Sequence, residues 1–187
     1  MAKVKGLKLS QSEVSQTIDL NELFGVNFSG NSGLAQAIGQ AIIDKMLERT
    51  ASGVGVDGKK LKSPYSPEYS NSLEFKAFGK SKNKVNMELT GQMLGTIDIV
   101  DASRGRIKIG WSDSEENAKA YNHNVGDTVP KRPFFGVSES DLKDIKEQYI
   151  DRVKQETAGL QSEQDRTISE IIKRLNPRNA FSFDEGP

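Results

Sequence analysis

Residues 107–138 constrain the fold more than any other part of the sequence. The first five residues alternate between apolar and other side chains up to Trp111, which is typical of a strand with one buried face. A short helix follows, and then a loop in which Pro130 and Pro133 favour an extended path, because proline also restricts the residue before it. The pattern indicates a backbone segment that is held in place and presented to a neighbour, and nothing in it resembles a catalytic centre.

The residues before this stretch predict the other strand of an antiparallel hairpin. Ile97 and Ile99 alternate with polar residues, and Gly105 can adopt the positive φ that a tight hairpin loop needs. Further upstream, residues 85–89 alternate as another strand, and one helical turn is expected between the two strands.

Two longer helices are predicted on either side of this region. The first begins after the cap cluster at residues 31–33. The second begins at Ser138, which forms a helix cap with Asp141, and its pattern weakens near Gly159 before returning up to Pro177. It is therefore either one long helix with a polar middle or two helices hinged near Gly159. The apolar stripes are Leu34, Ile38, Ala41, Ile42 and Met46 in the first helix, and Leu142, Ile145, Tyr149 and Val153 in the second.

These elements predict an α+β fold, in which a small antiparallel sheet with a hairpin is packed by an N-terminal helix and a long C-terminal helix, with extended arms. The expected division is an N-terminal arm at 1–33, an α+β core at 34–158 with a long loop at 50–84, and a C-terminal helical extension and tail at 159–187. Within the arm, residues 3–10 add an edge strand or stay mobile, and Ser12 and Ser15 are candidate helix caps.

Composition excludes several classes of function. The chain has no cysteine, so disulfides, thiolate nucleophiles and cysteine-bound metals are ruled out. Its 26 basic and 26 acidic side chains produce no overall field, which argues against nucleic-acid binding driven by net charge. No apolar run approaches the roughly 18 residues of a membrane span, so we expect a soluble protein made in the cytoplasm and no membrane contact.

Candidate catalytic patterns are weak. His123 is the only histidine, which excludes paired-histidine metal motifs, and no GxSxG elbow accompanies it. We expect His123 to serve as a structural hydrogen-bonding residue, with an unrecognised hydrolase as a minor alternative. Residues 53–58 spell GxGxxG, but a helix precedes them and a proline-containing stretch follows, so a flexible turn is predicted instead of a dinucleotide site. We therefore predict no catalytic, metal-binding or cofactor-binding residues, and no enzyme.

The long loop at 50–84 combines glycine and proline with aromatic and lysine residues, which argues against a long regular element. One interpretation is a loop whose aromatic side chains pack onto the sheet. The alternative is a nucleic-acid-binding module at residues 59–84, with base stacking and with Lys59, Lys60 and Lys62 as candidate DNA-facing residues.

Four segments occur together in one order: LTGQMLGTIDI at 89–99, IKIGW at 107–111, HNVG at 123–126 and PKRPFFGVS at 130–138. As a set they resemble the tailed-phage virion morphogenesis, or tail completion, family of the phage Mu protein G type. Members of that family show Leu-Thr-Gly-x-Leu, an Ile-Gly strand end, His-x-x-Gly, and Arg-Pro-Phe-Leu-Gly before a C-terminal helix. SPYSPEY at 63–69 also suits the family's Pro-Ser-Tyr loop. The match covers residues 34–153, and Met93 and Phe135 stand where the family more often has leucine.

This resemblance implies a structural virion protein that forms a ring in the neck, at the head–tail junction, and completes the tail. The implied partners are further copies in a hexamer or dodecamer, other neck and tail proteins such as the connector and tail terminator, and DNA in the channel. The implied location is the virion, with the host cytoplasm during assembly. The segments before Gly33 and after Gly159 lie outside the match.

We expect the subunit or partner contact at Lys131, Arg132, Pro133, Phe134 and Phe135, because two prolines preorganise this segment. Arg132 and Phe134 make a plausible anchor pair. In the tail, Phe181 and Phe183 are candidates for docking on a neighbouring subunit.

Overall fold

The computed structural model describes residues 4–28, 32–61, 65–82, 85–87 and 91–175. The fold is α+β, with one four-stranded antiparallel sheet of order β1-β2-β4-β3. The strands are β1 Leu7–Ser10, β2 Glu13–Asp19, β3 Asp98–Ser103 and β4 Arg106–Gly110. The longer helices are α2 Ser32–Ala51, α6 Ser114–Val125 and α7 Glu139–Leu175. The short helices are α1 Leu20–Phe24, α3 Pro67–Asn71, α4 Leu73–Ala77 and α5 Gln92–Gly95.

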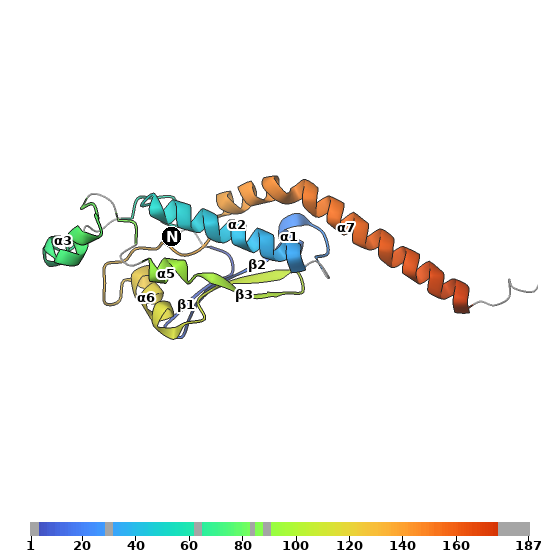
Figure 1. Cartoon of the computed structure of the whole chain (residues 1–187), viewed down its shortest axis with the longest axis horizontal. Helices are drawn as coiled ribbons and strands as arrows, with labels where there is room; N and C mark the ends of the chain where they lie inside the picture. Colours follow the sequence, from blue (N-terminus) through green and yellow to red (C-terminus); the bar gives the residue numbers. More distant parts are fainter. Residues whose placement is uncertain (1–3, 29–31, 62–64, 83–84, 88–90, 176–187) are drawn as a thin grey trace, which may run out of the picture.

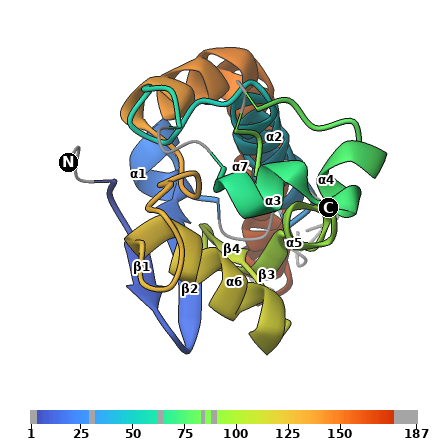
Figure 2. The same ribbon diagram turned by 90° about the vertical axis from the view of Figure 1, so that its left-hand side faces the viewer.

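The helices surround the sheet unevenly. Helix α2 packs on β3 and β4, whereas α6 packs on β1 and β2. In the end-on view of Figure 2, α1, α2 and α7 lie above the sheet, and α3 and α4 stand to one side. Figure 1 shows that α3 lies at one end of the molecule and the C-terminal part of α7 at the other. Within the described residues, no helix is both long and apolar enough to cross a membrane.

The hairpin of β3 and β4 confirms the prediction from alternation. Arg104 and Gly105 at its tip both have a positive φ, 50° for Arg104 and 72° for Gly105. This is the conformation of a two-residue turn that matches the twist of the flanking strands. Ile107 and Ile109 are fully buried on the inner face of β4. Residues 85–87, in contrast, form no strand, and residues 88–90 lie outside the described residues.

The stripe of α2 also packs as predicted, because Leu34, Ile38, Ile42 and Met46 are buried. The helix approaches the sheet closely at Gly39, where a Cβ would lie 2.5 Å from Ile99 Cδ1. The absence of a side chain at this position is therefore what allows helix and hairpin to pack in contact.

The expected N-terminal arm does not hold for its described residues, which belong to the core. Strand β2 pairs with β4, with Gln16 opposite Ile109, and Ser15 lies in this strand instead of capping a helix. The pattern was hidden because the inward-facing row of β2 has the buried Gln16 at its centre. The Gln16 amide accepts from Val137 N–H at 2.7 Å and donates to Lys5 O at 2.9 Å. Both ends of this polar side chain are therefore satisfied in the core.

Helix α7 is continuous through Gly159, which decides between the two alternatives for the C-terminal pattern. Its start is a reciprocal cap: Asp141 N–H donates to Ser138 Oγ, and Ser138 N–H donates to Asp141 Oδ2, both at 3.1 Å. Such a cap satisfies two N–H groups that the first turn leaves without helical partners. Phe181 and Phe183 lie outside the described residues.

Candidate functional site

The segment that was expected to contact a neighbour is instead largely buried within the chain. Phe134 and Phe135 are each 1% exposed and pack against Trp111, with ring centroids 6.3 and 4.8 Å away. In this fold, the ring of Phe134 therefore has no free surface with which to anchor a subunit contact. Lys131 is exposed and Pro133 is half-buried, so the part of the segment that reaches the surface is its beginning.

Both sides of this extended segment face protein, since it runs between α2 and α6. Four hydrogen bonds of its main-chain groups hold the segment to α6, to β2 and to the turn after α2. These are Arg132 N–H to His123 O at 2.6 Å, Phe135 N–H to Asn124 Oδ1 at 3.1 Å, Val137 N–H to Gln16 Oε1 at 2.7 Å, and Val56 N–H to Pro133 O at 2.9 Å. We call this internal segment, residues 131–137, the strut.

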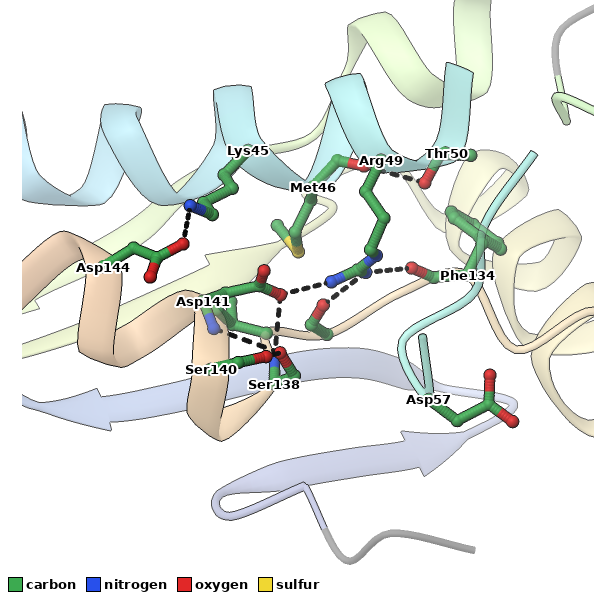
Figure 3. A network of polar contacts seen from close by, with 12 residues as sticks. Lys45, Met46, Arg49, Thr50, Asp57, Phe134, Ser138, Ser140, Asp141 and Asp144 are labelled. Carbon is green, nitrogen blue, oxygen red and sulfur yellow. Dashed lines mark hydrogen bonds and ion pairs between the residues drawn. The ribbon is translucent and has the colours of Figure 1, made fainter. Parts of the chain in front are cut away.

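Arg49 of α2 also binds the strut through hydrogen bonds (Figure 3). Arg49 Nη2 donates to Phe134 O at 2.8 Å and to Gly136 O at 2.7 Å, and Nη1 lies 2.6 Å from Asp141 Oδ2. Burial lowers the pKa of Arg49, and the nearby Asp141 carboxylate opposes that shift. Arg49 lies in the last turn of α2. The sequence around Arg49 does not predict these contacts, because Asp141 and Phe134 lie 92 and 85 residues away in the sequence.

Beside the strut lies a cavity of about 560 Å³ between α6, α5 and the long loop. Its walls combine aromatic, thioether and charged side chains. They include Tyr65, Tyr69, Met87, Met93, Glu116, Lys119, His123 and Arg132. Because this concave surface brings aromatic and charged side chains together, we treat it as the candidate site.

Cations and aromatic rings pair inside this cavity. The guanidinium of the buried Arg132 lies 5.2 Å from the centroid of the Tyr65 ring, and Lys80 Nζ lies 5.0 Å from the same ring. Both distances are in the range of cation–π contacts. Tyr65, Tyr69 and Phe75 also meet edge-to-face, with centroids 5.1 to 5.3 Å apart. These rings pack on one another and on cations, so they offer few free faces for base stacking.

His123 lines the cavity as a neutral imidazole. Burial, together with the positive charges of Arg132 and Lys80, lowers its pKa from 6.5 to about 4. Its backbone carbonyl accepts the bond from Arg132, whereas Nδ1 has no hydrogen-bond partner among the described residues. No carboxylate among the described residues is hydrogen-bonded to His123, so those residues do not show the geometry of a nucleophile–base–acid triad.

Glu116 and Lys119 lie one turn apart on the same face of α6 as His123, and sequence analysis did not single them out as a site. Glu116 is buried and Lys119 Nζ lies 2.8 Å from its Oε1. The first turn of α6 is capped by Asp113, which accepts from Glu115 N–H and Glu116 N–H. The helix cap accounts for the acidic residues in this turn. The sequence alone does not show that Glu116 is the one whose side chain is buried.

The candidate DNA-facing lysines lie apart from this cavity. Lys59 and Lys60 are exposed on the turn that follows α2, and Lys62 lies outside the described residues. No group of three or more His, Asp or Glu side chains in the described ranges is placed to hold a metal ion. Comparisons of this chain with family models, curated proteins and solved structures find no match.

Proposed function

We propose that this protein is a structural virion protein of a tailed phage, a ring-forming neck or tail-completion subunit at the head–tail junction. One observation supports the proposal most: the four segments of the family resemblance, separated in sequence, pack into one unit. Trp111 of the second segment meets Phe134 of the fourth edge-to-face and donates its Nε1–H to Met93 O of the first at 2.7 Å. Arg132 of the fourth segment bonds to His123 of the third. A set of residues that jointly holds a fold together is what a family signature is expected to contain.

The placement of exposed apolar side chains is consistent with a protein that assembles with other chains. Leu73 and Phe78 lie exposed at or next to α4, and Ile168, Ile171 and Ile172 lie exposed on α7, towards the other end of the molecule. Exposed clusters of large apolar residues are typical of contact surfaces. In the proposed function these surfaces meet further copies in a hexamer or dodecamer, the connector, or the tail terminator.

The test is to remove the gene from a phage that carries it and to examine the particles by electron microscopy. We expect filled heads and tails to accumulate unjoined, and expect the wild-type gene supplied in trans to restore joined particles. Purified wild-type virions should contain the protein in a multiple of six copies at the neck. Normal particles formed without the gene, or wild-type virions that lack the protein, would refute the proposal.

A second candidate function, nucleic-acid binding at residues 59–84, is favoured by local charge. This segment contains seven lysines and two glutamates, a net charge of +5 in a chain whose total is zero. Because the aromatic rings described above are packed, we attribute such binding to phosphate contacts alone. In a neck ring the same lysines would face DNA in the channel.

This candidate is tested by the affinity for duplex DNA at several salt concentrations. Binding through phosphates should weaken steeply with salt, and Lys59→Glu with Lys60→Glu should reduce the slope of log K against log salt by about two. Lys143→Glu with Lys146→Glu, which changes two exposed lysines of α7 in the same way, is the matched control. An affinity for duplex DNA that does not change with salt concentration would refute this candidate function.

A further inference from the structure

The cavity beside the strut contains polar atoms that no described residue satisfies. Glu116 is 2% exposed, its Oε1 pairs with Lys119, and its Oε2 has no hydrogen-bond partner among the described residues. His123 Nδ1, on the same helix, is also buried without a partner in that part of the chain. A buried acceptor without a donor is costly. Because both residues line the cavity, these atoms indicate that a bound molecule completes it.

The two atoms and the walls between them define what that molecule has to offer. A carboxylate oxygen only accepts hydrogen bonds, and the Nδ1 of a neutral imidazole accepts when the proton is on Nε2. Seven residues of helix separate Glu116 from His123, which is roughly 10 Å along the axis, so donors are needed at two places. The thioethers of Met87 and Met93 supply apolar wall surface. An extended peptide suits such a cavity, because its N–H groups repeat along its length and flexible thioethers adapt to its side chains.

Two cations of the lining reach the surface. Lys119 is exposed and Lys80 is half-buried. With Arg132, the described lining contains three cations against the one carboxylate of Glu116, a net charge of +2. Burial lowers the pKa of His123, and the charges of Arg132 and Lys80 lower it further, so the positive field extends into the cavity. A peptide that is apolar at first and then acidic would match both the walls and the two surface lysines.

Residues 179–185 of this chain have that composition. They read Asn-Ala-Phe-Ser-Phe-Asp-Glu, in which an uncharged stretch with two phenylalanines leads into two carboxylates. They follow α7, and Figure 1 shows the end of α7 at the opposite end of the molecule from α3, α5 and α6, which line the cavity. The eight residues from Leu175 to Phe183 span at most about 29 Å, whereas α7, with 37 residues, is about 55 Å long. The segment is therefore too short to return to the cavity of its own chain.

We propose that residues 179–185 of one copy of this protein bind in the cavity of a second copy. Phe181 and Phe183 pack against the thioether walls, and main-chain N–H groups of the segment donate to Glu116 Oε2 and His123 Nδ1. Asp184 and Glu185 pair with the two surface lysines. The contact is head-to-tail, so it joins copies into a ring or an open chain. It assigns a partner to the candidate site and does not depend on the phage assignment.

The first test uses the absence of cysteine from the chain, which makes single-cysteine variants unambiguous. Two full-length variants, Gln92→Cys on the cavity wall and Ser182→Cys in the segment, are mixed in equal amounts and oxidised. We expect a mixed disulfide dimer to form in clear excess over the mixture of Gln36→Cys with Ser182→Cys. Gln36 is the matched control, because it is exposed on α2 and does not line the cavity. Equal yields from the two mixtures overturn the proposal.

The second test measures the affinity of a labelled peptide of residues 179–185 for the full chain by fluorescence anisotropy at low salt. The receptor carries Phe181→Ala and Phe183→Ala, so that its own segment does not compete. Lys80→Glu in the receptor should weaken binding roughly ten-fold or more, and a peptide with Asp184→Lys and Glu185→Lys should recover that loss. Lys59→Glu, an exposed lysine apart from the cavity, should leave the affinity unchanged. Absence of binding, or equal effects of Lys80→Glu and Lys59→Glu, refutes the proposal.

The single histidine reports where the peptide binds. The NMR signals of the His123 ring should move as the peptide is added, and a bound peptide that leaves them unchanged would place the segment elsewhere and contradict the proposal. Circular dichroism, which should be the same for all variants, shows that each one is folded. A protein that binds the peptide in this way but is absent from wild-type virions refutes the proposed function alone. A protein present at the neck that fails both tests refutes this inference alone.

Discussion

The ion pair between Arg49 and Asp141 should contribute far more to the free energy of unfolding than the ion pair between Lys45 and Asp144, which joins the same two helices. Arg49→Met removes a cation whose side chain is 11% exposed and leaves Asp141, 14% exposed, without its partner. It also leaves the carbonyl oxygens of Phe134 and Gly136 without their donor. Methionine keeps the length and apolar stem of the arginine, so the change isolates the guanidinium.

The magnitude follows from burial. Removal of one partner of a buried ion pair costs about 3–5 kcal/mol, and the residual exposure of both groups places this case at the lower end, at about 3 kcal/mol. Two hydrogen bonds from a charged donor are lost with it, which makes a cost below about 1.5 kcal/mol incompatible with the structure. For a chain of this size, about 3 kcal/mol corresponds to a fall of roughly 6–12 °C in melting temperature.

Lys45→Met is the matched control, because Lys45 pairs with Asp144 at 2.5 Å one helical turn away and joins α2 to α7 as well (Figure 3). Its side chain is 31% exposed and that of Asp144 is 61% exposed. The pair should therefore contribute about 0–1 kcal/mol. Urea unfolding monitored by the fluorescence of Trp111, with equal slopes required for all variants, measures both costs.

The reasoning is refuted if Arg49→Met loses no more free energy of unfolding than Lys45→Met. A double-mutant cycle with Asp141→Asn provides a further check, because that change keeps an oxygen to accept from Ser138 N–H. The coupling energy between positions 49 and 141 should exceed about 1 kcal/mol.

Three further predictions concern the strut and its surroundings. The single histidine should titrate by NMR near pH 4. Because the unfolded chain binds that proton near pH 6.5, the stability from neutral His123 is complete above pH 6.5 and is lost as pH falls towards 4, and this dependence should disappear in His123→Gln. Phe134→Ala should cost about 3–5 kcal/mol in urea unfolding, since the ring is buried. Lys131→Ala, on the exposed part of the strut, should change the free energy of unfolding by no more than about 0.5 kcal/mol, and equal costs for the two variants would contradict the burial described here. Gly126→Ala should cost clearly more than Gly58→Ala in the same assay, since the Cβ at 126 would lie 2.6 Å from Lys131 Cβ, whereas Gly58 has a similar φ with open space around it. Gly58→Ala should show only the conformational penalty of about 1–2 kcal/mol for a left-handed residue.

Local patterns predicted the elements whose packing is regular. The hairpin around Gly105 and the helix carrying Ile38 both show a full apolar period, because one face of each is buried and the other is solvated. The cap of α7 at Ser138 was predictable for a similar reason, since its hydrogen bonds span only three residues.

The candidate site was less predictable, because its members come from distant parts of the chain. Arg132 was named from its place between two prolines, but the structure stacks it on Tyr65 inside the chain instead of presenting it to a partner. Phe134 and Phe135 were both predicted in the contact with a neighbouring chain, Phe134 as an anchor residue. Both are buried because protein lies on both sides of the strut, and only the assembled fold contains that information.

The sequence by itself determined the fold class, the hairpin, the two long helices and the exclusion of cysteine chemistry, because each depends on residues close together or on composition alone. The tertiary structure decided that β1 and β2 complete the sheet, since the central Gln16 of β2 interrupts the apolar period and its side chain bonds to Val137 and Lys5. It also decided that residues 132–137, most of the strut, lie within the protein, because Arg49 and Trp111 contact them from other elements. The structure also shows that the apolar pattern of α7 continues beyond the part of the helix that packs on the body, where Ile168, Ile171 and Ile172 are exposed.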